Sequence, residues 1–433
     1  MEAVTSIHST NPSLNSLECI YIDDFIQNYD LNGNYKSKEG KLHNHSIYIE
    51  SPSSFANAHD IVAIYQNVYN GTYPFKEMLD EDYVFQTFSD STYFWKIFTS
   101  SEPNTPSQII GCFTIVVDEE QKRAYMRGLN IRKDFQGKVK VRNLSYAMIR
   151  QFFQEHPNQI YSWYNESRTE HSIVQYLSNH IAAKPYAFFA GKDYFNLEKE
   201  SDMLMVAYTS DALHKYRQIP AAIHHSLAGL YFRIAYMHHF DTIPPIQSPK
   251  IPQINPCEIT SEIEKCMIYI KEDKYGYSHI TFTLPETHES MTFLHTHTVN
   301  NIEKIHFDYH KFSTMLAFMA LLMKYAEEKA IEYIEITIPA SDIQLTEYFL
   351  QSNYNIAGYV PAWIPSKMHP KMMEDAVIFS WHTPHITIPE PKLIMDSIHL
   401  TSILDSSNNI VRPTKDQSIQ MNYTLLQPIK SLF

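Results

Sequence analysis

Residues 46–208 alternate between short apolar runs of strand length and segments with helical periodicity. In the clearest helical segment, 55–69, Ile61, Ile64 and Val68 recur on one face after a Ser-Pro-Ser-Ser start signal. The strand-like runs are bounded by turn residues. The predicted elements, in chain order, are a strand at 47–50, helices at 55–69 and 83–88, strands at 92–98, 108–117 and 123–131, a helix at about 140–156, a strand at 160–165, a helix at 172–180, and strands near 186–190 and 203–208. This order predicts an α/β fold with a mixed sheet.

A second series follows a helical segment at 211–241 and a proline-rich stretch at 242–256, TIPPIQSPKIPQINP, which is typical of a linker or long surface loop. Its predicted elements are a helix at 258–266, strands at 267–271, 278–284 and 290–298, a helix at 312–329, a strand at 331–339, a helix at 342–352, and strands at 355–360 and 376–381. The last five elements repeat the order of the first series from its central strand onward. The pattern therefore indicates a duplicated fold.

These patterns divide the chain into five parts. They are an N-terminal extension at 1–45, a first domain at 46–210, a helical and proline-rich linker at 211–257, a second domain at 258–383, and a tail at 384–433. Within the tail, residues 398–404 and 419–426 alternate between apolar and polar positions, so we expect an ordered tail that returns as strands.

Composition narrows the class of protein. The 433 residues are 44% hydrophobic, which is enough for two cores. The net charge of −13, without a basic block, argues against nucleic acid or an anionic membrane as the main partner. It suits a cationic or amine substrate, although a generally acidic surface gives the same balance.

The cysteine usage and the length of the apolar runs favour a cytoplasmic protein, and we expect a monomer or a homodimer. The four cysteines, Cys19, Cys112, Cys257 and Cys266, form no CxxC pair, as expected in a reducing compartment. The longest apolar run, 315–323, is too short to span a bilayer, and we find no charged-then-apolar leader. Adjacent histidines occur at 224–225 and 238–239, but no HExxH or CxxC frame accompanies them, so we expect no metal.

The most informative segment is 125–150, where a strand-like run meets a turn at Gly137 and a helical pattern follows at once. Leu144 and Met148 mark the apolar face of that helix. Such a turn leaves backbone N–H groups at the helix N-terminus, where a phosphate or pyrophosphate binds. A glycine turn before a helix is structural in most proteins, so the surrounding elements must carry the functional case.

In this setting residues 46–208 resemble the GCN5-related N-acetyltransferase (GNAT) superfamily. The acetyl-CoA loop of that family reads R/Q-x-x-G-x-G/A, and residues 136–141 align with it. Gln136 matches the first position, whereas Val139 and Val141 replace the two glycine-type residues. The resemblance implies that CoA is bound by Leu129, Asn130, Ile131, Gln136, Gly137, Lys138, Val139, Lys140, Val141 and Arg142.

Other segments extend the resemblance. IIGCFTI (109–115) is similar to a family strand with an early glycine, and HSIVQYLSNHI (171–181) is similar to the second helix region. The resemblance places Tyr176 where the family has a tyrosine that protonates the departing thiolate. The backbone N–H groups of 129–131 would polarise the thioester carbonyl. Glu166, after the next strand, is our candidate base for the attacking amine.

The second domain resembles the same fold more faintly, and we interpret it as a degenerate copy. Phe349 stands where Tyr176 stands in the first domain, and no glycine turn precedes the helix at 312–329. A phenylalanine cannot donate a proton. This domain would cover the substrate face of the first domain or stabilise the pair. In AGYVPAWIP (357–365), Tyr359 and Trp363 are candidate substrate-pocket residues, although a packed aromatic corner explains them equally.

Two functions remain open at this stage. The first is an acyl-CoA-dependent N-acyltransferase, with acetyl as the expected group, acting on a primary amine of a small cationic acceptor. The second is a non-catalytic pair of GNAT-like domains that binds a ligand or partner, which the two valines of the loop favour.

Overall fold

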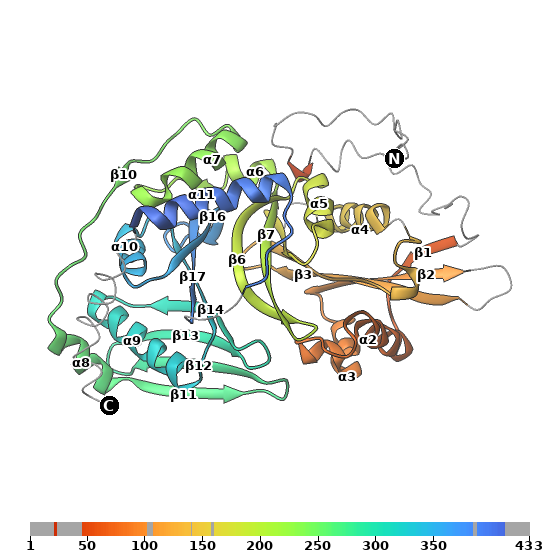
Figure 1. Cartoon of the computed structure of the whole chain (residues 1–433), viewed down its shortest axis with the longest axis horizontal. Helices are drawn as coiled ribbons and strands as arrows, with labels where there is room; N and C mark the ends of the chain where they lie inside the picture. The colour runs from red at the N-terminus through yellow and green to blue at the C-terminus, as the bar shows by residue number, and fades with distance from the viewer. Residues whose placement is uncertain are drawn as a thin grey trace.

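Fifteen strands form one continuous sheet in the computed structural model, which describes residues 21–23, 46–101, 107–139, 141–156, 160–383 and 388–411. Figure 1 shows this sheet running through the whole molecule. The strand order is β1-β2-β3-β4-β5-β7-β6-β16-β17-β15-β14-β13-β12-β11, and β8 pairs with β17 outside this path. The predicted α/β class with a mixed sheet is confirmed.

The first half of the sheet has the order β1-β2-β3-β4-β5-β7-β6, in which only β4 and β5 are parallel neighbours. Helices α4 and α5 lie on one face, and α2 and α3 lie on the other (Figure 1). The elements are β1 (Ser46–Glu50), α2 (Phe55–Tyr69), η1 (Lys76–Leu79), α3 (Glu81–Thr87), β2 (Tyr93–Ser101), β3 (Gln108–Asp118), β4 (Arg123–Ile131), η2 (Lys133–Phe135), α4 (Val141–Glu155), β5 (Ser162–Arg168), α5 (Ile173–His180), β6 (Lys184–Phe195) and β7 (Glu198–Tyr208).

The second half repeats that strand order as β11-β12-β13-β14-β15-β17-β16, again with one parallel pair, β14 and β15. Its elements are α8 (Pro256–Lys265), β11 (Met267–Glu272), β12 (Tyr277–Leu284), β13 (Glu289–Thr296), β14 (Asn301–Asp308), α9 (Phe312–Glu328), β15 (Tyr333–Pro339), α10 (Ile343–Gln351), β16 (Asn355–Pro365) and β17 (Met373–His382). Between the halves lie α6 (Ser210–His214), β8 (Arg217–Gln218), β9 (Ile223–His224), η3 (His225–Leu227), α7 (Ala228–His238) and β10 (Ile246–Gln247).

The halves join where β6 meets β16 through one antiparallel pair, Ala187 with Gly358. A Cβ atom on Gly358 would lie 2.4 Å from the Cβ of Ala187 and 2.4 Å from the carbonyl oxygen of Tyr186. The strands can therefore approach this closely only because position 358 has no side chain. One buried apolar cluster extends across both halves, and α11 (Met395–Val411) contacts β6, β16 and α7 above the joint.

Two sequence predictions were wrong. No strand was expected at 301–308, where the structure has β14, because a bulge at Lys304 interrupts the two-residue alternation. Residues 398–404 were expected as a strand and lie within helix α11. The other tail segment, 419–426, lies outside the described residues, as does almost all of 1–45.

Candidate functional site

Strands β4 and β5 separate after a short parallel pairing, which opens the first half of the sheet. They pair only from Arg123 with Ser162 to Tyr125 with Tyr164. Beyond that point the backbone of 126–131 has no partner strand on the β5 side. The main-chain donors and acceptors of β4 that face this gap therefore have no strand partner on that side.

A bulge in β4 lies at this gap. Cys112 of β3 faces Asn130 and Thr114 faces Arg127, so β4 carries one extra residue there. Gly128 adopts a φ of +69°, and a Cβ atom on it would lie 2.0 Å from the hydroxyl of Tyr65. Only glycine fits this position.

Two buried polar groups beside the bulge have no hydrogen-bond partner among the described residues, namely the Tyr65 hydroxyl and Nδ2 of Asn130. A buried polar group without a partner costs free energy, so both groups can gain from a polar ligand in the gap. Of the predicted carbonyl-polarising segment, Leu129 is half-buried, whereas Asn130 and Ile131 are buried. The segment belongs to the part of β4 that has no partner strand on the β5 side.

The turn before α4 leaves its outer surface open. Gly137 has a φ of +75°, and a Cβ atom on it would have no neighbour within 4 Å. The side chain of Gln136 donates to the carbonyl oxygen of Ile131 at 2.9 Å, which ties the turn to β4. Lys138 and Arg142 are exposed, and Lys140 lies outside the described residues.

The two valines of this turn are anchored in the protein. Val139 and Val141 are half-buried and pack against the hydrophobic core. The backbone N–H groups of Lys138 and Val141 donate to the carbonyl oxygens of Phe135 and Val139, at 3.1 and 3.0 Å, so two amides of the turn are engaged within it.

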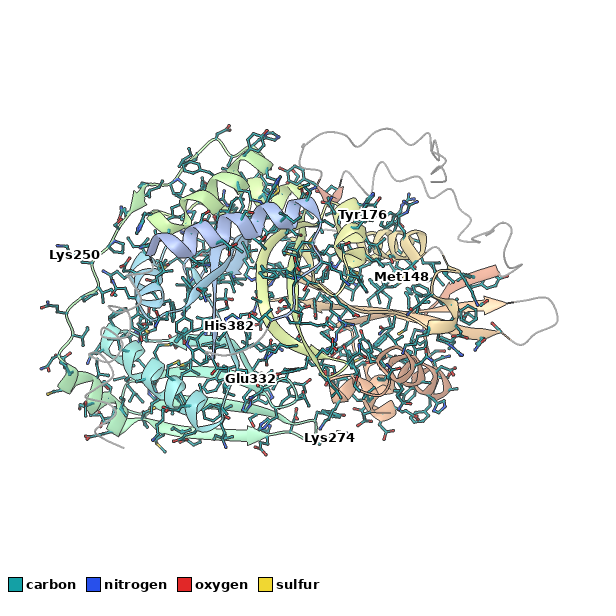
Figure 2. All side chains as sticks on the ribbon, in the orientation of Figure 1. Met148, Tyr176, Lys250, Lys274, Glu332 and His382 are labelled. Carbon is teal, nitrogen blue, oxygen red and sulfur yellow. The ribbon has the colours of Figure 1, made fainter. Side chains whose placement is uncertain are left out.

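Tyr176 lies on the α4 side of the sheet. Its side chain is 51% exposed on α5, and no described residue binds its hydroxyl. Figure 2 shows it beside the helix that carries Met148. The carbonyl oxygen of Tyr176 lies 2.8 Å from Nδ1 of His180, and the two rings are 4.1 Å apart.

Glu166 lies on the opposite face of the sheet. Its neighbour Asn165 donates to Ser178 of α5 at 2.8 Å, so the alternation of the strand directs Glu166 towards the face of α2. There Nζ of Lys192 donates to both carboxylate oxygens of Glu166 at 3.1 Å. The candidate base is thus held in an ion pair, and Arg168, two residues further along the strand, pairs with Glu200.

The second half contributes an equivalent glutamate to the same lysine. In each half, the residue three positions before the bulge pairs with the neighbouring parallel strand. Tyr125 of β4 pairs with Tyr164 of β5, and Asn301 of β14 pairs with Tyr333 of β15. Glu166 and Glu335 lie two residues further along β5 and β15, so they occupy corresponding positions. Lys192 donates to Glu335 at 3.0 Å as well.

The second half also covers the α2–α3 face of the first. The hydroxyl of Tyr277 donates to Glu77 at 2.7 Å, and Glu77 pairs with Arg127 of β4 at 3.2 Å. In the β11–β12 turn, Lys274 donates to Asp80 at 2.8 Å. Figure 2 places Lys274 at the tip of this hairpin, beside α3. Residues of both halves therefore line the face of the sheet towards which Glu166 points.

A carboxylate binds the turn that precedes α9, the helix in the second half that corresponds to α4. Glu289 accepts hydrogen bonds from the backbone N–H groups of His310 and Lys311, at 2.7 and 3.2 Å, and from the hydroxyl of Thr287 at 2.7 Å. Burial acts to raise the pKa of Glu289, but these hydrogen bonds outweigh it and lower the pKa below its ordinary value. The turn before α9 therefore holds a carboxylate of its own chain, at the place that corresponds to the Gly137 turn of the first half.

The two candidate substrate residues lie in the junction core. Tyr359 is fully buried and donates to Asp375 at 2.6 Å. Trp363 packs under the guanidinium of Arg123, 3.9 Å from its ring centre, and beside Tyr164. We therefore assign both rings to the packing of the two halves rather than to an open pocket.

The histidine pairs bind separate partners. His224 contacts Glu347 at 2.6 Å, and His238 contacts the hydroxyl of Tyr186 at 2.5 Å. Within the described ranges, no three His, Cys, Asp or Glu side chains converge in a way that suits a metal ion. No helix in those ranges combines the length and the apolar character needed to cross a bilayer.

Sequence reasoning did not single out Gly128, Lys192 or Glu335. An isolated glycine inside a strand pattern is a known bulge signal, so Gly128 was within reach. Lys192 and Glu335 meet Glu166 only through the long-range pairing of strands, for which the sequence holds no local signal.

In comparisons with known proteins, solved structures are similar to part of this chain. The sequence matches no protein-family model and no curated protein sequence. The chain is similar to the solved structure of spermidine N-acetyltransferase from Vibrio cholerae in complex with CoA and spermine, at 14% identity over 38% of this chain and 96% of that chain, with a TM-score of 0.31. It is also similar to the microcin C7 self-immunity acetyltransferase MccE in complex with acetyl-CoA and AMP, at 15% identity over 37% of this chain and 92% of that chain, with a TM-score of 0.30.

Proposed function

We propose that residues 46–210 form a GNAT-like domain that binds an acyl-CoA and transfers its acyl group, with acetyl as the expected group, to a primary amine of a small cationic acceptor. The gap between β4 and β5, with its bulge at Gly128, carries this proposal. In this proposal the two faces of the sheet, one with Tyr176 and the other with Glu166, meet at the gap near the N-terminus of α4.

In this proposal the turn before α4 holds the pyrophosphate through the amides of 137–141, aided by Lys138, Lys140 and Arg142. The amides of Lys138 and Val141 donate to Phe135 and Val139 in this structure, so binding requires these two amides to exchange their partners for the ligand. The unpaired backbone of β4 from 126 to 131 holds the amide-bearing pantetheine arm as an added strand would be held. The co-substrate supplies the activated thioester. The N–H groups of 129–131 orient towards its carbonyl oxygen, where negative charge develops.

In this proposal Tyr176 and Glu166 each carry out one of the two proton transfers. Tyr176 donates a proton to the departing thiolate from the α4–α5 face, and Glu166 accepts a proton from the acceptor amine on the other face. The acceptor approaches along the face of α2, between the halves.

Residues 258–383 form the degenerate copy in this proposal. Because Glu289 already binds the backbone N–H groups of the turn before α9, we propose that the second half binds no CoA and lines the acceptor site.

Calorimetric titration with CoA, together with a transfer assay that uses labelled acetyl-CoA and a panel of amines, tests the proposal. We expect one CoA site per chain and transfer to amines but not to alcohols. Failure of CoA to bind at millimolar concentration contradicts the catalytic role.

The second candidate function, a ligand-binding protein without catalysis, is favoured by the ion pair between Lys192 and Glu166, which engages the candidate base. Changing Val139→Gly together with Val141→Gly separates the two functions. In an enzyme this change alters the Michaelis constant for the acyl donor, whereas a binding module keeps its ligand affinity.

A further inference from the structure

We propose that two copies of this chain associate by pairing their β11 strands across a two-fold axis. Strand β11 is the last strand in the order of the sheet, so no described strand pairs with its outer edge. Figure 1 shows it at the outer margin of the second half. The inference goes beyond the proposed acyl transfer and does not depend on it.

Every residue of β11 (Met267–Glu272) is exposed. Four large apolar residues follow one another, since Met267 is 45%, Ile268 50%, Tyr269 53% and Ile270 52% exposed. Proteins usually protect a sheet edge with charged residues, proline or a bulge, and this apolar part of β11 has none of them. An unprotected apolar edge of this kind is a template for pairing with a further strand.

The equivalent strand of the first half, β1, is covered. Both strands contain the run Ile-Tyr-Ile, at 47–49 in β1 and at 268–270 in β11. Ile47 is 2% exposed and belongs to the main apolar cluster. In β11 the two isoleucines pair with Phe282 and Ile280, which are buried residues of β12, yet both isoleucines stay half exposed. The second half thus lacks a cover at the place where the first half has one.

The sequence of β11 is complementary to itself in one antiparallel register. A two-fold axis normal to the sheet keeps each face of the strand on its own side, so only residues separated by an even number of positions can face each other. With Tyr269 on the axis, this tyrosine faces its own copy and Ile268 faces Ile270. Met267 then faces Lys271, whose aliphatic stem covers it. Apolar surface therefore meets apolar surface along the pair, which favours a second copy as the occupant.

The neighbouring registers bring unfavourable pairs together. An axis at Ile268 brings Lys265 towards Lys271, and an axis at Lys271 sets that lysine against itself. An axis at Ile270 sets Ile268 against Glu272. The register centred on the tyrosine avoids all three pairs, and it brings Lys265 of each copy near Glu272 of the other. Charge complementarity therefore selects the same register as the apolar residues.

The size of this interface sets its expected strength. One six-residue strand from each copy is smaller than a standard interface, which involves about 20–30 residues a side. We therefore expect a reversible dimer with a Kd on the order of 10 µM.

Sedimentation velocity of the full chain, at loading concentrations from about 1 to about 200 µM, tests the inference. Tyr269→Lys places two like charges opposite each other on the axis, so the Kd of the dimer should rise at least about tenfold. The side chain is half exposed, so the melting temperature of the monomer should not change. Tyr48→Lys is the matched control, because Tyr48 is the 39% exposed tyrosine of the same run in β1. It should dimerise as the unchanged chain does.

Oxidative cross-linking tests the register. The two copies of position 269 face each other with Cβ atoms about 5 Å apart, so Tyr269→Cys should form a disulfide-linked dimer. The two copies of position 271 lie four residue steps apart, about 13 Å, so Lys271→Cys should not. The unchanged chain, treated with the same oxidant, controls for the exposed Cys257.

A chain that stays monomeric at about 200 µM, a dimer that Tyr269→Lys retains, or equal cross-linking at both positions would overturn the inference. Hydrogen exchange distinguishes a second copy from a segment of the same chain. The backbone amides of β11 should become protected only as the protein concentration rises. Protection that does not depend on concentration would show that residues outside the described ranges cover the strand, and it would overturn the inference as well.

Discussion

Gly128 is the tightest position in the candidate site. Its positive φ and the 2.0 Å approach of the Tyr65 hydroxyl to a built Cβ atom leave no space for another residue. The bulge that opens β4 towards the gap therefore depends on one missing side chain.

Replacing Gly128→Ala should destabilise the fold and reduce acyl transfer. The left-handed backbone costs a side chain roughly 1–2 kcal/mol, and displacement of Tyr65 adds to this. Chemical denaturation and a transfer assay measure the two effects. Gly276→Ala is the matched control, because Gly276 has a φ of +86° and no neighbour within 4 Å. Equal losses in both variants would show that Tyr65 does not constrain the bulge.

Tyr176→Phe tests the proton donor at the same scale. The side chain is half exposed, so the melting temperature should stay constant. Loss of a positioned proton donor should lower kcat roughly 10²-fold or more without changing the KM for the acyl donor. A kcat equal to that of the unchanged chain would remove Tyr176 from the mechanism.

At this scale, candidate residues could be predicted from the sequence, but their surroundings could not. The turn at Gly137 and the exposed Tyr176 could be placed from local patterns. The burial of Tyr359 and the ion pair of Glu166 with Lys192 could not, because both result from contacts between distant strands.

The turn before helix α9 is held by a carboxylate of the same half. Glu289 of β13 binds the backbone N–H groups of His310 and Lys311, directly before the helix, and places negative charge near its N-terminus. Among the described residues, no acidic side chain takes this place in the turn before α4, and this difference distinguishes the two halves more clearly than their sequences do.

Changing Glu289→Gln should lower the free energy of unfolding by about 1–3 kcal/mol at neutral pH, because a neutral amide then replaces the charged carboxylate that accepts these hydrogen bonds. The folded-state pKa of Glu289 lies below its unfolded value, so its contribution is full above the unfolded pKa and is lost as the pH falls through the folded pKa. Denaturation curves between pH 3 and 7 should therefore converge for the two proteins at the acid end. Parallel curves at every pH would contradict this role.

Element types followed from periodicity wherever the pattern was regular. The 55–69 and 312–329 helices are examples, since both bury a continuous apolar face. Strand β14 was not predicted because its bulge at Lys304 shifts the alternation of apolar and polar residues. Helix α11 was predicted as a strand because a short apolar alternation does not distinguish a helix from a strand.

At the scale of the whole molecule, the single β6–β16 pair joins two half-sheets into one. Because the apolar core and the ion pairs of Lys192 with Glu166 and Glu335 both cross this joint, we expect the chain to unfold in one cooperative transition. Calorimetry with equal van't Hoff and calorimetric enthalpies would agree with this, and two separate transitions would not.

Gly358→Ala should weaken the joint by about 1–3 kcal/mol, since its Cβ atom would overlap Ala187 and Tyr186. Thermal unfolding measures the loss. Gly229→Ala on α7 is the control, because its nearest neighbour lies 3.3 Å away at the end of the Ile403 side chain. A melting temperature unchanged by Gly358→Ala would show that the joint tolerates wider spacing.

The same joint has a consequence for synthesis on the ribosome. Ala187 of β6 meets its partner Gly358 only about 170 residues later in the chain. At a translation rate of about 5–20 residues per second, the edge of β6 stays unpaired for roughly ten to thirty seconds. An uncovered strand edge is a template for association with other chains. Slower translation beyond residue 240 should therefore increase aggregation of nascent chains, and faster translation should suppress it.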